Sequence, residues 1–511
     1  MAYPPRWRHP RTVKSNAVPA GTGPEHEPDT EGGPQLVRPN SKPPWPRRAW
    51  LLAVLLPTAA ATGIATATAA ASPAQPAAPA TPIRHVVVIF LENHSFDNVL
   101  GYWCDMPRNF GRCPDGGMPS SVALSDGAVV TPGTSPDTVP PVNHNVASQV
   151  NAIDSGRMDG WQQIAGCSVT ENYACISGYQ PRQVPNLTTL ARQFAISDHT
   201  FSVGDAPSFE GHIAIAAASQ DHFYGNNPNG GSFAFPGWGC DSGHRTPWIA
   251  PNGTRRNVPS CVPDPSLNPV KYPYGGAFAP TPVHYIPTIM DRLQAAGLPW
   301  KIYGAPKDEK GYGLWDICPT FAECLDTSQV ENLVPDAQFL TDAGAGTLPA
   351  FSVVTPGGQD FLNAGHNGMS MARCDNWAGQ LVSAVENSPD WSSTAVFLTF
   401  DDFGGFYDQV RPPVEPDGTQ EGPRLPLIII SPYAKPGYTD TKATTFAGIL
   451  AYTEHNFGLQ ALGVNDAGAY GFANAFNYAQ TPLHPVPMSA RRLPASAERI
   501  RLTPELARDP T

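Results

Sequence analysis

The sequence contains no Cys-x-x-Cys pair, no internal repeat and no excess of basic residues. The missing Cys-x-x-Cys pair argues against a zinc ribbon or a thioredoxin-like redox site. Lys and Arg total 32 against 44 Asp and Glu, which gives a formal net charge of −12 and disfavours non-specific binding of nucleic acid. The same acidic balance offers no long-range attraction for an anionic substrate. Any phosphate would therefore have to be captured by a local cation.

The chain also lacks a clean membrane-spanning run. Its apolar segment opens at Arg47-Arg48-Ala49-Trp50, is broken by Pro57 and then grades into Ala and Thr, which makes it a poor spanning helix. A basic start, an apolar middle and small residues at the end are typical of an export signal, and the Arg-Arg pair resembles a twin-arginine signal. We expect a disordered polar leader over residues 1–48, an export signal with an Ala/Pro linker over residues 49–82, and a secreted or cell-surface protein. An uncleaved N-terminal membrane anchor is the alternative.

The remaining chain is long enough for one large α/β domain or two smaller ones, and its 58 Pro and 47 Gly require long loops. Single apolar strands alternate with helices, which predicts a mostly parallel central sheet between helical layers. We place this domain at residues 83–485 and a loose C-terminal tail at residues 486–511. The predicted strands are residues 83–91, 195–199, 300–303, 351–356, 394–400 and 424–432, and the predicted helices are residues 186–194, 213–219, 286–297, 378–387 and 446–457.

Eight of the nine cysteines fall into couples that are close in sequence. In an exported protein with long loops, such couples are expected to form disulfides that pin the loops. The spacing does not fix the connectivity, and Cys374 is left over. The couples are Cys104 with Cys113, Cys167 with Cys175, Cys240 with Cys261, and Cys318 with Cys324.

Two of the predicted strands run directly into hard oxygen ligands. The strand that begins at Ile83 ends at Glu92-Asn93, and the strand that begins at Thr394 ends at Asp401-Asp402. Open α/β sheets bind ligands at the carboxyl ends of their strands. Three carboxylates and an amide suit Ca²⁺, Mg²⁺ or Mn²⁺, and carboxylates can also hold Zn²⁺. The pattern predicts a divalent cation held between the two strands; the plainer interpretation is that polar residues end strands and start turns.

Ser208 lies where a loop opens a helix rich in small residues. A hydroxyl at this position is often an N-cap. It is also where a nucleophile gains most, because a helix N-terminus favours a phosphoryl group. His144 lies in the long loop of residues 101–185, and His366 lies in a Gly/Asn-rich loop where a core role is not expected. Two interpretations of His366 remain open: a surface histidine and a catalytic one.

The stretch Glu92-Asn93-His94-Ser95-Phe96-Asp97 resembles the signature of a bacterial phosphoesterase family that contains phospholipases C and related acid phosphatases. The resemblance continues in order through residues 201–212, 289–303, 387–408 and 422–432. It implies an alkaline phosphatase-like fold, a divalent metal ion held by Glu92, Asn93, Asp401 and Asp402, and Ser208 as the nucleophile. It also implies that His144 and His366 contact phosphate or act as acid.

Two positions depart from the family pattern. Gly211-His212 stands where the family often has Asn-Arg or Asn-His, and Gln409 stands where it usually has His. The expected function is an exported metal-dependent phosphoester hydrolase that acts on a phospholipid at a membrane surface or on a small phosphoester, with no nucleic-acid partner. A cell-surface binding module with weakened chemistry is the alternative that the departures motivate. A sulfatase-like enzyme is a third alternative. Such an enzyme needs a modifiable Cys or Ser in a motif of its own, and Cys374 has no convincing context for this role. The oligomeric state is open.

Overall fold

The structure is a computed structural model that describes residues 79–501, except residues 110, 205, 229–236, 268–280 and 415–419. The predicted polar leader and nearly all of the predicted export segment lie outside this part of the chain. Within it, no helix has the length and hydropathy needed to cross a membrane.

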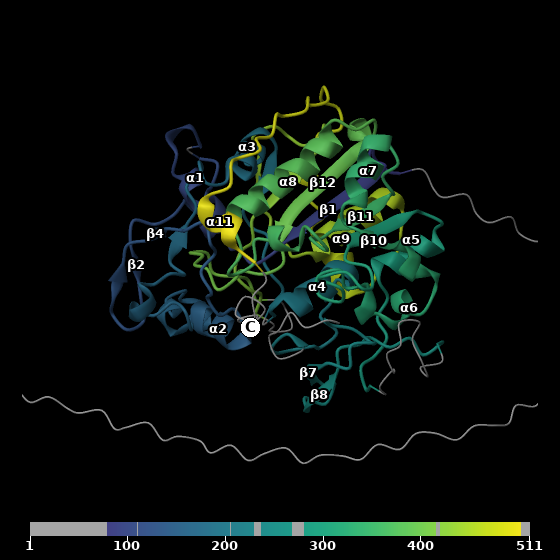
Figure 1. The fold of residues 1–511 in the computed structure, drawn as a ribbon, viewed down its shortest axis with the longest axis horizontal. Helices are drawn as coiled ribbons and strands as arrows, with labels where there is room; N and C mark the ends of the chain where they lie inside the picture. Colours follow the sequence, from purple (N-terminus) through teal and green to yellow (C-terminus); the bar gives the residue numbers. More distant parts are fainter. Residues whose placement is uncertain are drawn as a thin grey trace, which may run out of the picture. The chain divides into compact units, whose positions relative to one another are not determined.

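An eight-stranded sheet lies at the centre, in the order β10-β9-β11-β1-β12-β13-β6-β14 (Figure 1). All neighbouring pairs are parallel except the two that involve β13, which is antiparallel to both of its neighbours. The predicted mostly parallel sheet is confirmed, and the two short strands at its edges are additions to the prediction. The strands are β1 (His85–Leu91), β6 (Ala195–Ser197), β9 (Trp300–Gly304), β10 (Leu333–Pro335), β11 (Phe351–Val354), β12 (Thr394–Phe400), β13 (Leu427–Ile430) and β14 (Thr439–Asp440).

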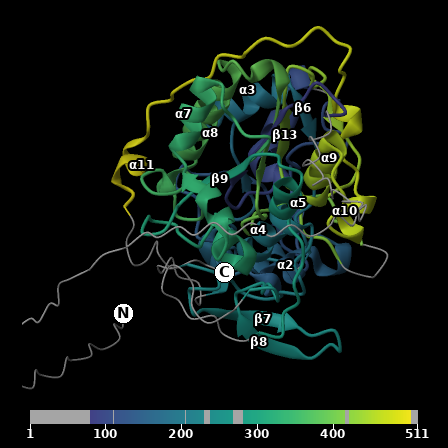
Figure 2. The same cartoon turned by 90° about the vertical axis from the view of Figure 1, so that its right-hand side faces the viewer.

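Helices cover both faces of this sheet, as predicted (Figure 2). One layer contains α3, α7 and α8, and the other contains α4, α5, α9 and α10. The bounds are α3 (Pro185–Gln193), α4 (Ser208–Ala217), α5 (Ile289–Ala295), α7 (Gln338–Ala345), α8 (Met371–Glu386), α9 (Ala447–Phe457) and α10 (Val464–Gly468).

Three helix starts differ from the prediction by several residues. Helix α4 begins at Ser208, five residues before the predicted residue 213, and side-chain caps set the other two starts. Helix α8 begins seven residues before the predicted Ala378, since the Ser370 side chain accepts a hydrogen bond from the backbone N–H of Arg373. Helix α5 begins after Thr288, which forms a capping box with Asp291.

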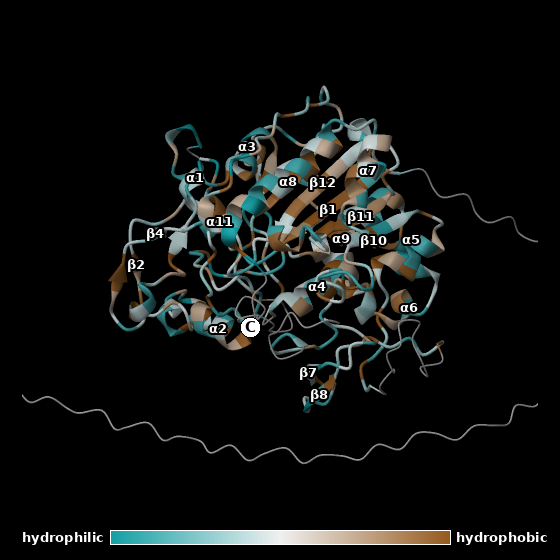
Figure 3. Cartoon of the chain, in the orientation of Figure 1, coloured by the Kyte–Doolittle hydropathy of each residue, from teal (hydrophilic) through white to brown (hydrophobic). Residues whose placement is uncertain are grey.

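Strands β1 and β12 form the middle of the sheet, and both are mostly apolar (Figure 3). Every residue of β12 is buried, and every residue of β1 after His85 is buried as well, as expected for strands covered on both faces. They pair in parallel from His85 with Thr394 to Leu91 with Phe400. The two strands therefore end at the same level, and Glu92 and Asp401 leave the sheet side by side.

Long loops carry the remaining short elements. The loop of residues 101–185 contains α1 (Tyr102–Cys104), α2 (Val146–Ile153), the β2–β3 hairpin (Val122–Ala123 and Val129–Val130) and the β4–β5 pair (Gly133–Thr134 and Ser177–Gly178). A second hairpin, β7–β8 (Arg245–Ile249 and Arg255–Pro259), follows α4, and α6 (Ala322–Leu325) follows β9. All four predicted cysteine couples form disulfides, and Cys374 is buried without one.

The segment after residue 485 makes more specific contacts than a loose tail would. The backbone N–H of Ser489 donates to the Asn186 side chain at 2.7 Å, and that of Arg491 donates to the Asn376 side chain at 2.9 Å. The chain then enters the short helix α11 (Ala495–Arg499). Residues 486–501 thus lie along α3 and α8.

Candidate active site and metal centre

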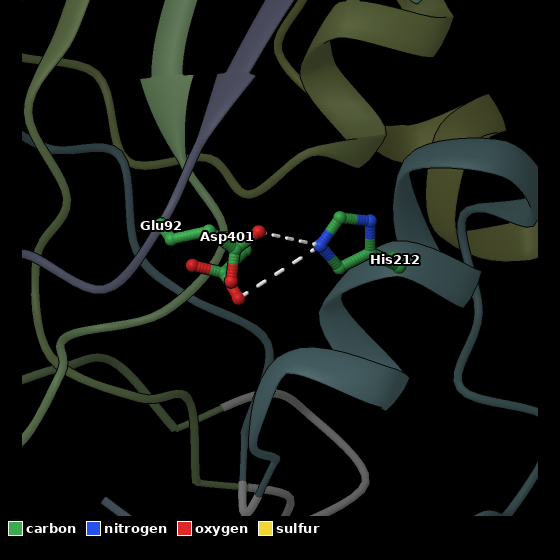
Figure 4. Close-up of side chains that lie close together, drawn as sticks. All are labelled: Glu92, His212 and Asp401. Carbon is green, nitrogen blue, oxygen red and sulfur yellow. Dashed lines mark hydrogen bonds and ion pairs between the residues drawn. The ribbon is translucent and has the colours of Figure 1, made fainter. Parts of the chain in front are cut away.

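Glu92 and Asp401 meet at the carboxyl ends of β1 and β12, and both side chains are completely buried (Figure 4). The backbone N–H of Asp401 donates to the carbonyl of Leu91 at 3.0 Å, which extends the strand pairing by one residue. The two carboxylates that the sequence placed at separate strand ends therefore face one space.

His212 also points into this space, from helix α4 (Figure 4). Its Nε2 lies 3.0 Å from Oε1 of Glu92 and 3.9 Å from Oδ2 of Asp401. One ligand atom from each of the three residues lies within 4.8 Å of the others. Sequence reasoning did not assign His212, although its position one helical turn after Ser208 puts both side chains on the same face of α4.

Burial controls the ionisation of this cluster. Loss of solvent lowers the pKa of His212 to about 3, against a smaller opposing effect of the Trp315 carbonyl. Burial, followed by the charge of Asp402, raises the pKa of Asp401 to about 7, while hydrogen bonds from Ser208 and Asn93 act in the opposite direction. A divalent cation would offset the cost of keeping these carboxylates charged.

Ser208 is the first residue of α4, and the N-cap interpretation of its hydroxyl is wrong. Pro207 occupies the cap position, and the Asn227 side chain accepts a hydrogen bond from the backbone N–H of Phe209 in the first turn at 2.9 Å. Instead, the Ser208 Oγ donates to Oδ2 of Asp402 at 3.2 Å and lies 3.3 Å from the Asn93 amide. The hydroxyl is thus turned toward the predicted metal ligands.

Asp402 and Asn93 are fixed by a tight turn. The Asp402 Oδ1 accepts from the backbone N–H of Gly404 at 2.7 Å, and Asn93 has a left-handed backbone with φ of 66°. A Cβ on Gly404 would lie 2.0 Å from the Asn93 carbonyl oxygen, so only glycine fits there. This close approach holds the Asn93 backbone against the turn that follows Asp402.

The Asn93 side chain lies between the carboxylates and the two predicted histidines. One end of its amide is 3.2 Å from Nε2 of His144 and 2.9 Å from Nε2 of His366; the other end is 2.9 and 3.2 Å from the two Asp401 carboxylate oxygens. The rings of His144 and His366 also contact each other edge to face, with centroids 5.8 Å apart. The structure therefore brings both predicted histidines to the site.

The orientation of the Asn93 amide depends on whether the site holds a cation. The Nδ1 atoms of His144 and His366 face the backbone carbonyls of Val142 and Asn367, at 3.2 and 3.1 Å. Neutral rings that donate from Nδ1 offer Nε2 as an acceptor, so the Asn93 NH₂ group would donate to them and its carbonyl oxygen would face Asp401. An amide oxygen that faces the Asp401 carboxylate oxygens is favourable when all of these oxygens coordinate one cation. Without a cation, the amide turns its NH₂ group to Asp401.

His94 follows Asn93 in sequence but has a structural role. Its ring nitrogens lie 2.8 Å from Oδ1 of Asn98 and 3.0 Å from the carbonyl of Gly365, and the ring stacks on Phe406. Burial lowers its pKa to about 4. Both nitrogens are already engaged, so His94 does not contribute to the metal cluster.

A second group with potential metal ligands occurs in the part of the chain that the structure describes. It consists of Asp115, Asp198 and His199. Both ring nitrogens of His199 already contact these carboxylates, at 2.9 Å for Asp198 and 3.4 Å for Asp115. This arrangement is that of a histidine bridging two acids.

Comparison with known proteins identifies the family. The model of the phosphoesterase family matches residues 83–460, so this chain belongs to that family. A non-hemolytic phospholipase C of Pseudomonas aeruginosa is 25% identical over 467 residues, which cover 79% of this chain and 58% of the relative. The chain therefore spans less than two thirds of that relative. A phospholipase C B of Mycobacterium tuberculosis is 24% identical over 460 residues, which cover 79% of each chain.

The likeness extends to a plant protein and to solved structures. The non-specific phospholipase C6 of Arabidopsis thaliana is 22% identical over 449 residues, covering 80% of this chain and 75% of the relative. A Vibrio parahaemolyticus protein of the alkaline phosphatase superfamily gives a TM-score of 0.30 at 13% identity, covering 56% of this chain and 63% of that one. A TM-score this low says nothing about the site.

Proposed function

We propose that this protein is an exported, metal-dependent phosphoester hydrolase with Ser208 as its nucleophile. In this proposal Glu92, Asn93, Asp401 and Asp402 hold a divalent cation, which is Ca²⁺, Mg²⁺, Mn²⁺ or Zn²⁺. The observation that carries the proposal is the position of the Ser208 hydroxyl: it is buried at the first residue of α4 and donates to Asp402 at 3.2 Å. A hydroxyl with only a capping role would instead bond to a backbone N–H of its own helix.

The chemistry follows from these groups. A bound cation would draw charge from the phosphoryl oxygens and lower the pKa of the Ser208 hydroxyl. Ser208 Oγ forms a bond to phosphorus while the bond to the leaving alkoxide breaks, and the proton of the attacking hydroxyl passes to the Asp402 carboxylate that it contacts. The phosphoserine that results lies at the N-terminus of α4, where the helix dipole favours its negative charge. Water then attacks phosphorus and gives a proton to the imidazole that served as acid. The bond between phosphorus and Ser208 Oγ breaks, Asp402 returns its proton to Ser208, and the phosphate leaves.

His144 and His366 are the proposed acids. Both reach the Asn93 amide, whose other end reaches Ser208 at 3.3 Å. This places two imidazoles one side chain away from the nucleophile. The rings are neutral while Nε2 accepts from Asn93, and an imidazole that takes up a proton once the phosphate is bound can give it to the departing alkoxide.

We propose a phospholipid as the substrate, since the three relatives compared above carry the name phospholipase C. This substrate requires the protein to contact a membrane surface. An acid phosphatase-like monoesterase is the other form of the proposal.

Export is supported by the four disulfides, which persist outside the reducing cytosol. Replacing both Arg47 and Arg48 by Lys should retain the protein in the cytoplasm if the twin-arginine signal is correct.

The first test uses the full-length chain, stripped of metal and resupplied with single divalent ions. We expect metal-dependent hydrolysis of p-nitrophenyl phosphorylcholine that Ser208→Ala lowers by about a thousandfold or more. Turnover of p-nitrophenyl phosphate alone would instead indicate the phosphatase form. A folded protein that turns over neither substrate with any ion would favour the binding module.

A further inference from the structure

We infer that Nε2 of His212 binds the cation directly, and that this nitrogen makes the site prefer Zn²⁺ to Mg²⁺ and Ca²⁺. The inference deepens the proposed function and rests on it only for the presence of a cation at this site. It adds a ligand of a different chemical class to the four oxygen donors that the sequence indicated.

The spacing of the donor atoms suits the ligands of a single cation. The His212 Nε2 lies 3.0 Å from Oε1 of Glu92 and 3.9 Å from Oδ2 of Asp401. Ligands held at 2.0–2.1 Å from one ion are about 2.8–3.0 Å apart at octahedral angles and about 3.3–3.4 Å apart at tetrahedral angles. The His212–Glu92 pair is therefore spaced as two ligands of one ion would be, and the chemistry of the donors decides which ion is preferred.

Packing holds the imidazole in this orientation. The His212 ring contacts the edge of Phe90, with centroids 4.8 Å apart, and the edge of Trp238 at 5.8 Å. His212 is 1% exposed, and Glu92 and Asp401 are 0% exposed. A ligand fixed in this way loses little conformational freedom when the ion binds.

Donor chemistry then sets the preference. Carboxylate and amide oxygens alone suit Mg²⁺, Ca²⁺ and Mn²⁺, whereas an imidazole nitrogen favours Zn²⁺ and neighbouring transition metals. Mg²⁺ also gives up its water ligands reluctantly. A fully buried cluster with a nitrogen donor is therefore unfavourable for Mg²⁺ on both counts.

The competing interpretation is that His212 only hydrogen-bonds to Glu92 and orients it. In that case the ion contacts oxygen atoms alone, and His212 is a positioning residue. The two interpretations differ in the metal preference of a His212 variant and in the atoms that surround a bound ion. Neither measurement requires turnover.

The first experiment measures binding of Zn²⁺ and Mg²⁺ to the metal-free full-length chain by competition titration. We use the Asp115→Asn background, which removes a ligand from the second group at His199. His212→Asn should lower the Zn²⁺-to-Mg²⁺ affinity ratio about 10- to 100-fold, because it replaces the nitrogen donor that favours Zn²⁺ with an amide oxygen. His85→Asn is the control: it removes an imidazole at the opposite end of β1 from Glu92, where the ring contacts the Pro349 carbonyl, and it should leave the ratio unchanged. An unchanged ratio in folded His212→Asn would overturn the inference.

The second experiment needs no variant and decides the question if His212→Asn fails to fold. Crystals of the wild-type protein are loaded with zinc and measured at the zinc absorption edge. We expect an anomalous peak about 2.0–2.1 Å from Nε2 of His212. A zinc peak surrounded by oxygen atoms alone, or no peak at this cluster, would overturn the inference. If wild-type protein with zinc bound at His212 hydrolyses neither p-nitrophenyl substrate, the proposed hydrolase is contradicted, but the metal assignment still stands.

Discussion

The backbone N–H of Gln409 donates to Oδ2 of Asp97 at 2.9 Å, and the Gln409 side chain donates to the Gly117 carbonyl at 2.6 Å. The phosphoesterase family usually has His at the position of Gln409. These contacts attach the loop after Asp408 to the segment after β1 and to the long loop of residues 101–185. The glutamine thus has a structural task that requires no imidazole.

We therefore predict that Gln409→Ala changes stability more than chemistry. Loss of the partly buried hydrogen bond to the Gly117 carbonyl costs about 1 kcal/mol, which a urea titration would measure. The kcat/KM of the folded variant should stay close to that of the wild type, and Gln409→His should not raise it markedly. A large loss of kcat/KM at unchanged stability would show that this position takes part in the reaction.

Arg424→Met should destabilise the fold strongly. Arg424 is completely buried, and its guanidinium donates to Oδ1 of Asp408 at 2.8 Å and to Oδ1 of Asp97 at 3.1 Å. Its removal leaves two buried carboxylates without a cation, at a cost of about 3–5 kcal/mol. Arg424→Lys keeps the charge but loses the forked geometry, so it should fall between wild type and Arg424→Met in chemical denaturation. Equal stability of the two variants would contradict this account.

Gly211→Ala should disturb the site because α4 packs directly on the end of β12. A Cβ at Gly211 would lie 3.0 Å from the carbonyl oxygen of Asp401. Either Asp401 or the helix must shift, so we expect weaker metal binding and lower kcat. Gly344→Ala in α7 is the control, because nothing lies within 4 Å of its added Cβ; it should be neutral or stabilise by up to about 1 kcal/mol. Identical effects of the two substitutions would refute the steric argument.

His366→Asn should slow the release of poor leaving groups more than good ones. A general acid contributes about 10²–10⁴-fold when the leaving alkoxide is strongly basic, and p-nitrophenolate needs little protonation. The ratio of kcat for an alkyl diester to kcat for the p-nitrophenyl diester should therefore fall in this variant. The same comparison for His144→Asn shows which of the two histidines is the acid. If both variants slow both diesters equally, the histidines bind phosphate rather than donate a proton.

His199 should make the stability depend on pH. Its pKa is raised above the ordinary 6.5, mainly by the hydrogen bond to Asp198, with Asp115 adding to the rise and burial and Arg424 opposing it. The folded state binds this proton more tightly than the unfolded chain does, so the stabilisation is complete below pH 6.5 and is lost as the pH rises through the folded-state pKa. Thermal melts of wild type and His199→Asn should differ at acidic pH and converge at alkaline pH. Curves that remain parallel would exclude this contribution.

Local patterns were sufficient for much of the fold. The apolar runs of β1 and β12 are long and bounded by polar residues, so both strands could be placed from the sequence. The cysteine couples were predictable because each lies close along the chain. The starts of α5 and α8 were not, since Thr288 and Ser370 act as caps only in relation to N–H groups that the helix presents. The edge strands β10 and β14 are too short to leave a periodic signal.

The residues of the site also divide into those that the sequence could indicate and those that only the tertiary structure identified. Glu92, Asn93, Asp401, Asp402 and Ser208 could be selected because each ends a strand or opens a helix, where side chains are free for chemistry. His212 could not be separated from His94 by sequence, since both adjoin a recognised motif. Only their surroundings differ: His94 has both nitrogens engaged by Asn98 and Gly365, whereas Nε2 of His212 faces two carboxylates.

The sequence by itself determined the central strands, the polar side chains at their ends, the local disulfides and the acidic balance, because each depends on neighbours along the chain. The tertiary structure decided which of these groups meet. The parallel register that pairs Leu91 with Phe400 brings Glu92 beside Asp401, and the close packing of α4 at Gly211 brings His212 to both. Such contacts join residues about 120 to 310 positions apart, and they depend on strand register and helix packing, which no local periodicity specifies.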